Sequence, residues 1–189
     1  MNLPIVVGIT GASGVIYGVE ILRALKKLEV PTHLIITEAG ARTLILETEI
    51  ALAEIKALAD VVHSNRDIAA SISSGSFLTR GMIVAPCSIK TLSSIANSYD
   101  ADLVARAADV TLKERRPLVL MVRETPLHKG HLELMARAAD YGATIQPPMP
   151  AFYHKPQTLQ DIVDQGVARA LDQLGVTHAL FPRWGDQNA

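Results

Sequence analysis

Residues 8–14, Gly-Ile-Thr-Gly-Ala-Ser-Gly, place small and hydroxyl side chains between an apolar run and a segment with helical periodicity. A strand–helix turn leaves the amides of the first helical turn without acceptors, and the helix dipole favours an anion there. Glycine lets a ligand approach the backbone. The G-x-x-G-x-x-G spacing differs from the dinucleotide motif, and no P-loop lysine follows. The turn predicts a phosphate-bearing ligand, with a tight connection that binds nothing as the alternative.

Two later stretches also gather hydroxyl groups. Residues 73–76, Ser-Ser-Gly-Ser, suit a loop that holds phosphate oxygens, although an ordinary flexible loop has the same composition. Residues 86–91, Pro-Cys-Ser-Ile-Lys-Thr, lead from an apolar strand into a helix, where Ser88 can act as the N-cap and leave amides for a ligand. Cys87 in this position is more typical of a small buried side chain than of a nucleophile.

Charged residues follow at two places. Arg106 and Lys113 lie seven apart, on one stripe of a helix, with Asp109 between them to neutralise both; a solvated charged face is the alternative. Arg123 and Glu124 end an apolar strand. An arginine there can bind a phosphate or carbonyl oxygen in a forked geometry, and a carboxylate beside it can move a proton.

Two other patterns favour structural roles. Thr37 and Glu38 close the second strand, where an acidic residue would bind ribose in a nicotinamide enzyme. The glycine spacing argues against that site, so we favour an N-cap threonine beside a surface glutamate. His128 and His131 are three apart, but no third ligand is near in sequence and no H-E-x-x-H or C-x-x-C motif occurs. We therefore expect no metal site.

Short apolar runs alternate with helical patterns along the chain. We expect strands at residues 3–10, 31–37, 61–63, 81–86 (stopped by Pro86), 117–122 and 143–146, and helices at 15–28, 39–59 with a break near 48, 88–97, 101–115, 131–141 and 158–174. Strands without alternation are covered on both faces, and the order implies parallel pairing. The predicted fold is α/β, a three-layer α/β/α arrangement with a mainly parallel sheet of the flavodoxin or Rossmann kind. Ligands bind at the C-terminal ends of such strands.

Composition limits the class of protein. At 189 residues the chain suits one domain, and its net charge of −1 draws it neither to nucleic acid nor to an anionic membrane. The single cysteine excludes an internal disulfide and, with no basic signal-peptide start, points to the cytoplasm. The scarce aromatic residues include Tyr153 and Trp184 on loops, which suggests contact with a planar ligand or another subunit.

Together these stretches resemble a known family. G-I-T-G-A-S-G, S-S-G-S, A-P-C-S-I-K-T-L, R-A-A-D-V-x-L-K-E-R-R-P-L-V-L-x-x-R-E-T-P-L and P-x-M-P-A-F-Y-H-x-P occur in this order. They are similar to the flavin prenyltransferase (UbiX-type) family from residue 7 to residue 184, most specifically at 106–127. The resemblance implies a single flavoprotein domain over residues 1–189 in a homo-oligomer, commonly a dodecamer. It also implies a tail from about residue 176 to 189 that packs on a neighbouring subunit.

The resemblance further implies an activity and its residues. Reduced FMN and dimethylallyl monophosphate would bind, and the prenyl group would be joined to flavin N5 and C6 without a metal, giving the prenylated FMN used by a UbiD-type decarboxylase. The positions that match FMN-contacting segments are Gly11, Ala12, Ser13, Thr37, Ser88, Ile89, Lys90, Thr91 and Arg123. Those that match the prenyl-phosphate site are Ser74, Gly75, Arg106, Lys113, Tyr153, Arg169 and Trp184, with Glu124, Ser13 and Lys113 in catalytic positions.

Three other functions stay open. FMN-dependent cysteine decarboxylases of this fold carry P-A-S-A-N-T and P-x-M-N-x-x-M-W stretches; here residues 86–91 and 147–150 differ from both. A non-catalytic FMN carrier would have no use for a second cationic phosphate site, which Arg106, Lys113 and Arg169 are expected to form. A nicotinamide dehydrogenase is the most distant alternative.

Overall fold

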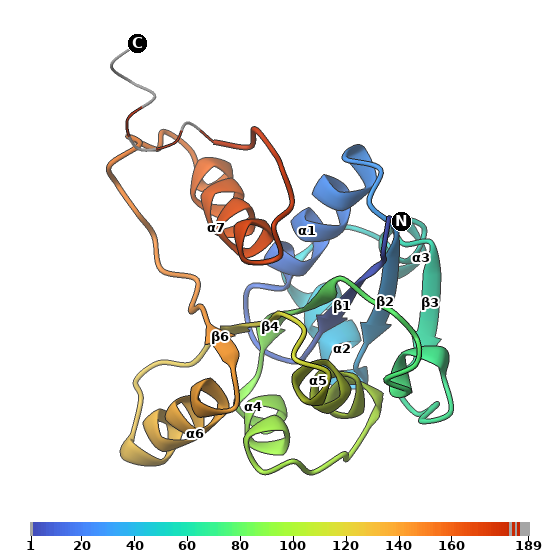
Figure 1. Ribbon diagram of the computed structural model, residues 1–189. Coiled ribbons are helices and arrows are strands. Elements are labelled where there is room, and N and C mark those ends of the chain that lie inside the picture. The colour runs from blue at the N-terminus through green and yellow to red at the C-terminus, as the bar shows by residue number, and fades with distance from the viewer. Residues whose placement is uncertain (1, 182, 184, 186–189) are drawn as a thin grey trace.

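A six-stranded sheet forms the centre of the molecule, and each neighbouring pair of strands runs parallel. The computed structural model describes residues 2–181, 183 and 185 (Figure 1). The strands are β1 (Ile5–Ile9), β2 (Thr32–Ile36), β3 (Val61–Ser64), β4 (Gly81–Cys87), β5 (Leu118–Val122) and β6 (Ala143–Ile145). The helices are α1 (Val15–Lys27), α2 (Glu38–Glu47), α3 (Leu52–Lys56), the 3-10 turn η1 (Ser71–Ser73), α4 (Ile89–Ala96), α5 (Leu103–Lys113), α6 (Lys129–Asp140) and α7 (Leu159–Gln173).

Helices cover both faces of this sheet, as Figure 1 shows. Successive residues of a strand point to opposite faces, so Ile5 and Val7 of β1 join one apolar core while Val6 joins the other. The first core packs under α1 and α7, and the second under α4, α5 and α6. This double burial explains the unbroken apolar strands, and the predicted three-layer α/β/α fold is confirmed.

The strand order is β3-β2-β1-β4-β5-β6. After β1 the chain builds outward through β2 and β3, then crosses to the other side of β1 to begin β4. The order therefore reverses between β1 and β4, and a crevice opens at the C-terminal ends of strands at such a point. The loops that follow β1 and β4 contain the glycine turn and residues 86–91, so the topology brings these two stretches together.

β4 extends one residue past Pro86, so the prediction that this proline stops the strand is wrong. Proline lacks an N–H, and the pairing of β4 with β5 shifts between Val84 and Cys87. The Pro86 carbonyl still accepts hydrogen bonds, from the amide and hydroxyl of Thr10 just after β1, at 3.3 and 2.7 Å. β4 therefore continues past Pro86, because the proline carbonyl is paired although its nitrogen cannot donate.

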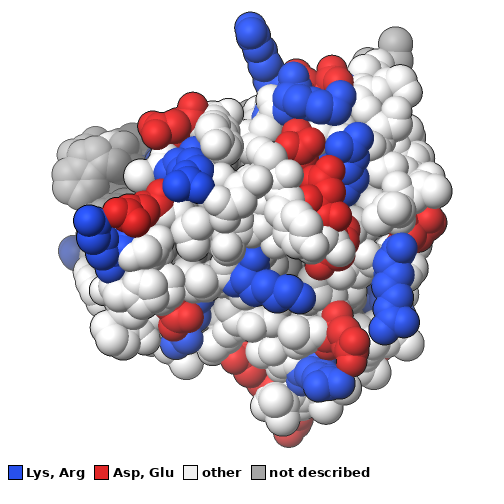
Figure 2. Space-filling model, turned by 90° about the horizontal axis from the view of Figure 1, so that it is seen from below, with Lys and Arg blue, Asp and Glu red and all other residues white. Residues whose placement is uncertain are grey.

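Charges are interspersed on the face that carries α4, α5 and α6. Figure 2 shows acidic and basic side chains alternating there, with wide uncharged areas between them. A nucleic-acid-binding face is marked instead by a continuous basic stripe. Within the described part of the chain, none of the helices combines the length and apolar character needed to cross a bilayer.

We predict that Gly18→Ala destabilises the fold. Gly18 lies where α1 crosses the sheet, and an added Cβ would meet the Ala85 carbonyl oxygen and lie 2.8 Å from Cγ1 of Ile9. Although alanine favours a helix by about 1 kcal/mol over glycine, we expect a net loss of about 1–3 kcal/mol from overpacking, measured by urea unfolding. Gly130→Ala is the control, because an added Cβ there would meet only the His128 side chain, whose nearest atom lies 3.0 Å away. Equal stability of Gly18→Ala and the wild type would contradict the packing argument.

Candidate functional site

A cleft of about 450 Å³ lies at the point where the strand order reverses. It is built from the loops that follow β1, β2, β3, β4 and β5. Its lining residues are Gly11, Thr37, Glu38, Ala39, Asn65, Arg66, Ser88, Ile89, Lys90, Thr91, Asp102 and Glu124. Six of the residues predicted to contact FMN, and the predicted catalytic Glu124, therefore line one cavity.

Local helix chemistry positions the polar groups of this cleft. Thr37 is the N-cap of α2 and accepts a hydrogen bond from the Gly40 amide at 3.0 Å, as its structural interpretation predicted. Ser88 is the N-cap of α4 and accepts from the Thr91 amide at 3.3 Å. The first amides of α4 then have no acceptor within the helix, which suits an anion. At Gly11 an added Cβ would collide with the Ala39 side chain, so glycine is required there.

The glycine turn differs from the prediction in what its amides bind. The Glu47 carboxylate, from the last residue of α2, accepts from the amides of Gly14 and Val15 at 2.8 and 3.2 Å. The helix terminus predicted to receive a ligand phosphate is therefore already occupied by an internal anion. Sequence reasoning missed Glu47 because only the tertiary fold brings α2 beside α1.

Glu47 also links two predicted site residues. Partial burial opposes its ionisation, but hydrogen bonds from the Ser13 side chain and the two amides, with the nearby charge of Arg123, lower its pKa below the usual value. Ser13 and Arg123 thus lie around one ionised carboxylate. Glu124 follows at the end of β5, where its Oε1 accepts from the Thr125 amide at 3.0 Å.

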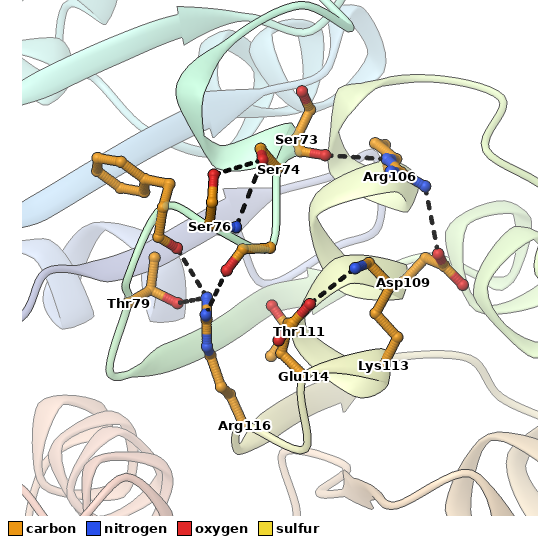
Figure 3. A network of polar contacts seen from close by, with 12 residues as sticks. Ser73, Ser74, Ser76, Thr79, Arg106, Asp109, Thr111, Lys113, Glu114 and Arg116 are labelled. Carbon is orange, nitrogen blue, oxygen red and sulfur yellow. Dashed lines mark hydrogen bonds and ion pairs between the residues drawn. The ribbon is translucent and has the colours of Figure 1, made fainter.

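A second polar cluster joins residues 73–76, here called the serine loop, to α5 (Figure 3). Arg106 donates from Nε to the Ser73 carbonyl at 3.1 Å and from Nη1 to Asp100 at 2.9 Å. Gly75 packs so tightly on this helix that an added Cβ would collide with Glu114 and lie 2.9 Å from Lys113 Nζ. The structure therefore places Ser74, Gly75, Arg106 and Lys113 close together, and their role in holding a prenyl phosphate stays a prediction.

Two details of that cluster differ from the sequence prediction. Asp109 pairs with Arg106 at 3.5 Å, but Lys113 pairs with Glu114 at 2.7 Å, so the prediction that Asp109 neutralises both cations is wrong for Lys113. The hydrogen bond and charge of Lys113 lower the pKa of Glu114. Sequence reasoning also missed Arg116, which donates to the carbonyls of Gly75 and Phe77 at 2.7 and 2.8 Å and holds the loop on α5.

The remaining prenyl-phosphate residues lie elsewhere. Arg169 is on α7, which covers the sheet face opposite to α5. It lines a hollow of about 280 Å³ together with Gln165, and Gln165 Nε2 donates to the Tyr153 hydroxyl at 3.4 Å. One chain therefore presents the predicted residues as two groups on opposite sides of the sheet. Trp184 lies outside the described residues.

Two further expectations concern the cysteine and metals. Cys87 is fully buried, and burial raises the pKa of its thiol to about 12. Because the thiolate is the nucleophile, this cysteine is a structural apolar residue. Among residues 2–181, 183 and 185, no three His, Cys, Asp or Glu side chains are grouped to hold a metal ion.

The fold and the cleft define a class of flavin-binding α/β proteins, and comparison with known proteins agrees. The Flavoprotein family model matches residues 1–171. The flavin prenyltransferase UbiX of Escherichia coli K12 is 60% identical over 183 residues, which cover 95% of this chain and 97% of the relative. The chain belongs to the UbiX-type flavin prenyltransferase family, and it is a transferase.

Solved structures agree with this assignment. The crystal structure of AnUbiX (PadA1) in complex with FMN and dimethylallyl pyrophosphate matches with a TM-score of 0.95 at 47% identity, over 97% of each chain. The dodecameric FMN-dependent UbiX-like decarboxylase from Escherichia coli O157:H7 matches with a TM-score of 0.94 at 50% identity, over 96% of this chain and 99% of that one.

We predict a pH-dependent effect of Glu47→Gln on stability. The pKa of Glu47 is lower in the folded protein than its usual 4.5, so its ionised form stabilises the fold above that value, and this contribution is lost as the pH falls through the folded pKa. The variant should melt at a lower temperature than the wild type at pH 7, and the difference should shrink below pH 4.5. Exposed Glu49, two residues on, provides the control Glu49→Gln. A difference that does not depend on pH would contradict an electrostatic role.

Proposed function

We propose that this protein joins the dimethylallyl group of dimethylallyl monophosphate to N5 and C6 of reduced FMN. The observation that carries the proposal is the coexistence of two polar sites: the cleft at the strand ends, and the polar cluster where Arg106 and Lys113 meet the serine loop. The identity with UbiX relatives supports it and argues against both the cysteine decarboxylase and the passive carrier.

The cleft has the features that FMN requires. Gly11 lines the cleft and has no side chain, so its backbone is accessible to the flavin ring there. The amide end of α4, with Lys90 and Thr91, offers donors and a positive charge to the ribityl phosphate. Because Glu47 occupies the start of α1, the FMN phosphate is better placed at α4 than at the glycine turn.

The prenyl-phosphate residues of one chain serve the cleft of a neighbour in this proposal. Asp102 lines the cleft as the N-cap of α5, whereas Lys113 is the last residue of that helix. At a rise of roughly 1.5 Å per residue, Lys113 lies about 16 Å along the helix from Asp102. Arg169 lies on the opposite side of the sheet. A dodecameric structure is known for a relative that is 50% identical, and a similar homo-oligomer would bring these groups to one site.

The residues then have distinct tasks. Reduced FMN supplies the electron-rich N5 and C6 to which the prenyl carbons bond. Lys113 and Arg106 meet the charge that develops on the phosphate as the C–O bond breaks. Arg106 is held for this by Ser73 and Asp100. Tyr153 and Trp184 exclude water, which would capture an allylic cation.

Proton transfer is assigned to the carboxylate side of the cleft. The bond to C6 forms when the prenyl double bond takes up a proton and C6 attacks the resulting cation; Glu124, which lines the cleft, supplies that proton and accepts the one that leaves C6. Ser13 donates a hydrogen bond to Glu47, and in this proposal it orients the reacting groups. The product would serve a UbiD-type decarboxylase, and a cytoplasmic location fits the single reduced cysteine.

The reaction is tested directly by mass spectrometry of the flavin. The protein is mixed anaerobically with reduced FMN and dimethylallyl monophosphate, and we expect the flavin mass to rise by one prenyl unit. Dimethylallyl pyrophosphate is tested in parallel, because a related structure contains it. Unmodified flavin with both donors, in the presence of folded protein, would refute the proposed reaction.

Glu124→Gln tests the proton-transfer role. The amide keeps the shape of the side chain but takes up no proton, so we expect prenylated FMN to form roughly 100-fold more slowly, with FMN affinity unchanged. Glu38→Gln is the matched control, because Glu38 lines the same cleft but its carboxylate pairs with Arg42 at 2.7 Å. Prenylation at the normal rate by Glu124→Gln would remove Glu124 from the mechanism.

A mixing experiment tests whether neighbouring subunits complete the site. Lys113→Ala and Glu124→Gln are each expected to be nearly inactive. If Lys113 of one chain serves the cleft of another, oligomers formed by co-expressing the two variants will contain some complete sites and regain part of the activity. Mixed oligomers that stay as inactive as the parents would place both residues in the same chain's site.

A further inference from the structure

Arg116 lies just beyond the end of α5, and its side chain reaches back to the segment that carries the serine loop. Its Nη2 donates to the Gly75 carbonyl at 2.7 Å, and its Nη1 donates to the Phe77 carbonyl at 2.8 Å and to Thr79 Oγ1 at 3.4 Å. Figure 3 shows the guanidinium pointing from the turn after α5 toward this loop. Three acceptors of the loop segment therefore converge on one guanidinium.

The backbone at the end of α5 sets the direction of this side chain. Arg115 has a left-handed conformation, with a φ of 55°. The amide of Arg115 donates to the Leu112 carbonyl, and that of Arg116 donates to the Thr111 carbonyl, each at 2.9 Å. A left-handed residue and such bonds close a helix and reverse the chain. Arg116 therefore leaves the helix in a direction that does not depend on the loop.

The contact with Arg116 fixes the orientation of a peptide unit in the serine loop. The Gly75 carbonyl points at the guanidinium, and in a trans peptide the following N–H points the opposite way. The Ser76 amide therefore faces away from Arg116. It lies 3.4 Å from Ser74 Oγ, and the hydroxyl oxygens of Ser74 and Ser76 are 2.9 Å apart. The serine hydroxyls are thus gathered on the side of the loop away from Arg116.

Gly75 is also the point at which the loop meets the charged end of α5. An added Cβ there would collide with Glu114 and lie 2.9 Å from Lys113 Nζ. Lys113 pairs with Glu114 at 2.7 Å, and its side chain is 47% exposed. A displacement of Gly75 would therefore change the distance between the loop and the Lys113 ammonium group.

A second arginine holds the other end of the serine loop, with different partners. Arg106 Nε donates to the Ser73 carbonyl at 3.1 Å, and the same guanidinium pairs with Asp100 and Asp109. The acceptors of Arg116 are instead two carbonyls and a hydroxyl of the loop segment. Arg116 is thus a link between the end of α5 and the loop, made through neutral groups.

We propose that Arg116 is a positioning residue for the prenyl-phosphate site. By holding the Gly75 and Phe77 carbonyls, it keeps the Ser74 hydroxyl in a fixed position relative to Lys113, so that both can bind one phosphate monoester. Arg116 acts through the loop and does not itself contact the phosphate. This inference rests on the proposed function, which assigns Ser74, Gly75 and Lys113 to that site.

The test compares Arg116→Gln with the wild-type oligomer. A glutamine side chain cannot fork onto two carbonyls, so the loop should lose its fixed position. We expect KM for dimethylallyl monophosphate to rise about tenfold, the order of one hydrogen bond to a charged group, with kcat much less affected. FMN affinity should stay unchanged, because the residues that line the cleft do not include the serine loop.

A binding measurement gives a readout that needs no activity. A ligand that binds only the folded protein raises its melting temperature as the ligand concentration exceeds Kd. Dimethylallyl monophosphate should therefore stabilise the wild type, and Arg116→Gln should need about ten times more of it for the same shift. Arg116→Lys keeps the charge without the fork and should give an intermediate value. If Arg116→Gln does not fold, Arg116→Lys carries the test.

Arg80→Gln is the matched control. Arg80 is half-buried like Arg116 and also holds a loop by two carbonyls, because its Nε donates to Leu174 at 2.8 Å and its Nη2 donates to Gly175. Its loss should lower the melting temperature without ligand, but KM and the shift caused by dimethylallyl monophosphate should stay as in the wild type. A change in both variants would indicate general loosening of the fold and overturn the positioning role.

A double-mutant cycle tests whether Arg116 acts through the serine loop. Ser74→Ala removes a group that Arg116 is proposed to position. Adding Arg116→Gln to it should therefore raise KM by clearly less than the same change does in the wild type, since coupled residues are not additive. Fully additive effects would show that Arg116 acts independently of Ser74.

The outcomes separate this inference from the proposed function. Unchanged KM and an unchanged ligand-induced shift in Arg116→Gln or Arg116→Lys overturn the positioning role. A wild-type protein that is stabilised by dimethylallyl monophosphate but leaves the flavin mass unchanged overturns the proposed reaction, while the melting measurements still decide on Arg116. A wild-type protein that this ligand does not stabilise has no such phosphate site, and the inference is then refuted as well.

Discussion

A buried threonine hydroxyl joins the ends of the two central strands, and the rest of the site is built around it. Thr10 Oγ1 donates to the Pro86 carbonyl at 2.7 Å and accepts from the Ser88 amide at 2.9 Å. Thr10 is buried and Ser88 is half-buried. An unpaired polar group in a buried position costs about 1–3 kcal/mol. The turn after β1 and the N-terminus of α4 are therefore held in one geometry, and the cleft between them is preformed.

The distribution of charge in the molecule decides which helix end is available to a ligand. The N-termini of α2, α4 and α5 line the cleft and that of α1 lies near it, and a helix N-terminus attracts an anion. Glu47 neutralises the start of α1 with an internal carboxylate, while α4 has only the neutral Ser88 as its cap. In the proposed mode of binding, the flavin phosphate therefore takes the start of α4, because the start of α1 already holds the Glu47 carboxylate.

The sheet also separates the residues that are proposed to hold the prenyl phosphate. Arg106 and Lys113 are fixed on one face by the serine loop, and Arg169 is fixed on the other by Asp172. A sheet covered on both faces cannot let these groups meet within one chain. Assembly of several copies would let such chains surround a small phosphate from several directions. The side chain of Phe152 is 69% exposed, which fits a surface that contacts another subunit.

Periodicity and local chemistry alone were sufficient for the elements, the parallel pairing, the caps at Thr37 and Ser88, and the burial of Cys87. These follow from interactions between residues close in sequence or from apolar runs that require cover on both faces. The resemblance of the sequence motifs to those of known proteins identified the family. The tertiary structure alone decided that Glu47 reaches the start of α1 and that Arg116 holds the serine loop. Each of these depends on where a side chain arrives once distant elements have packed, and no spacing along the chain encodes that position.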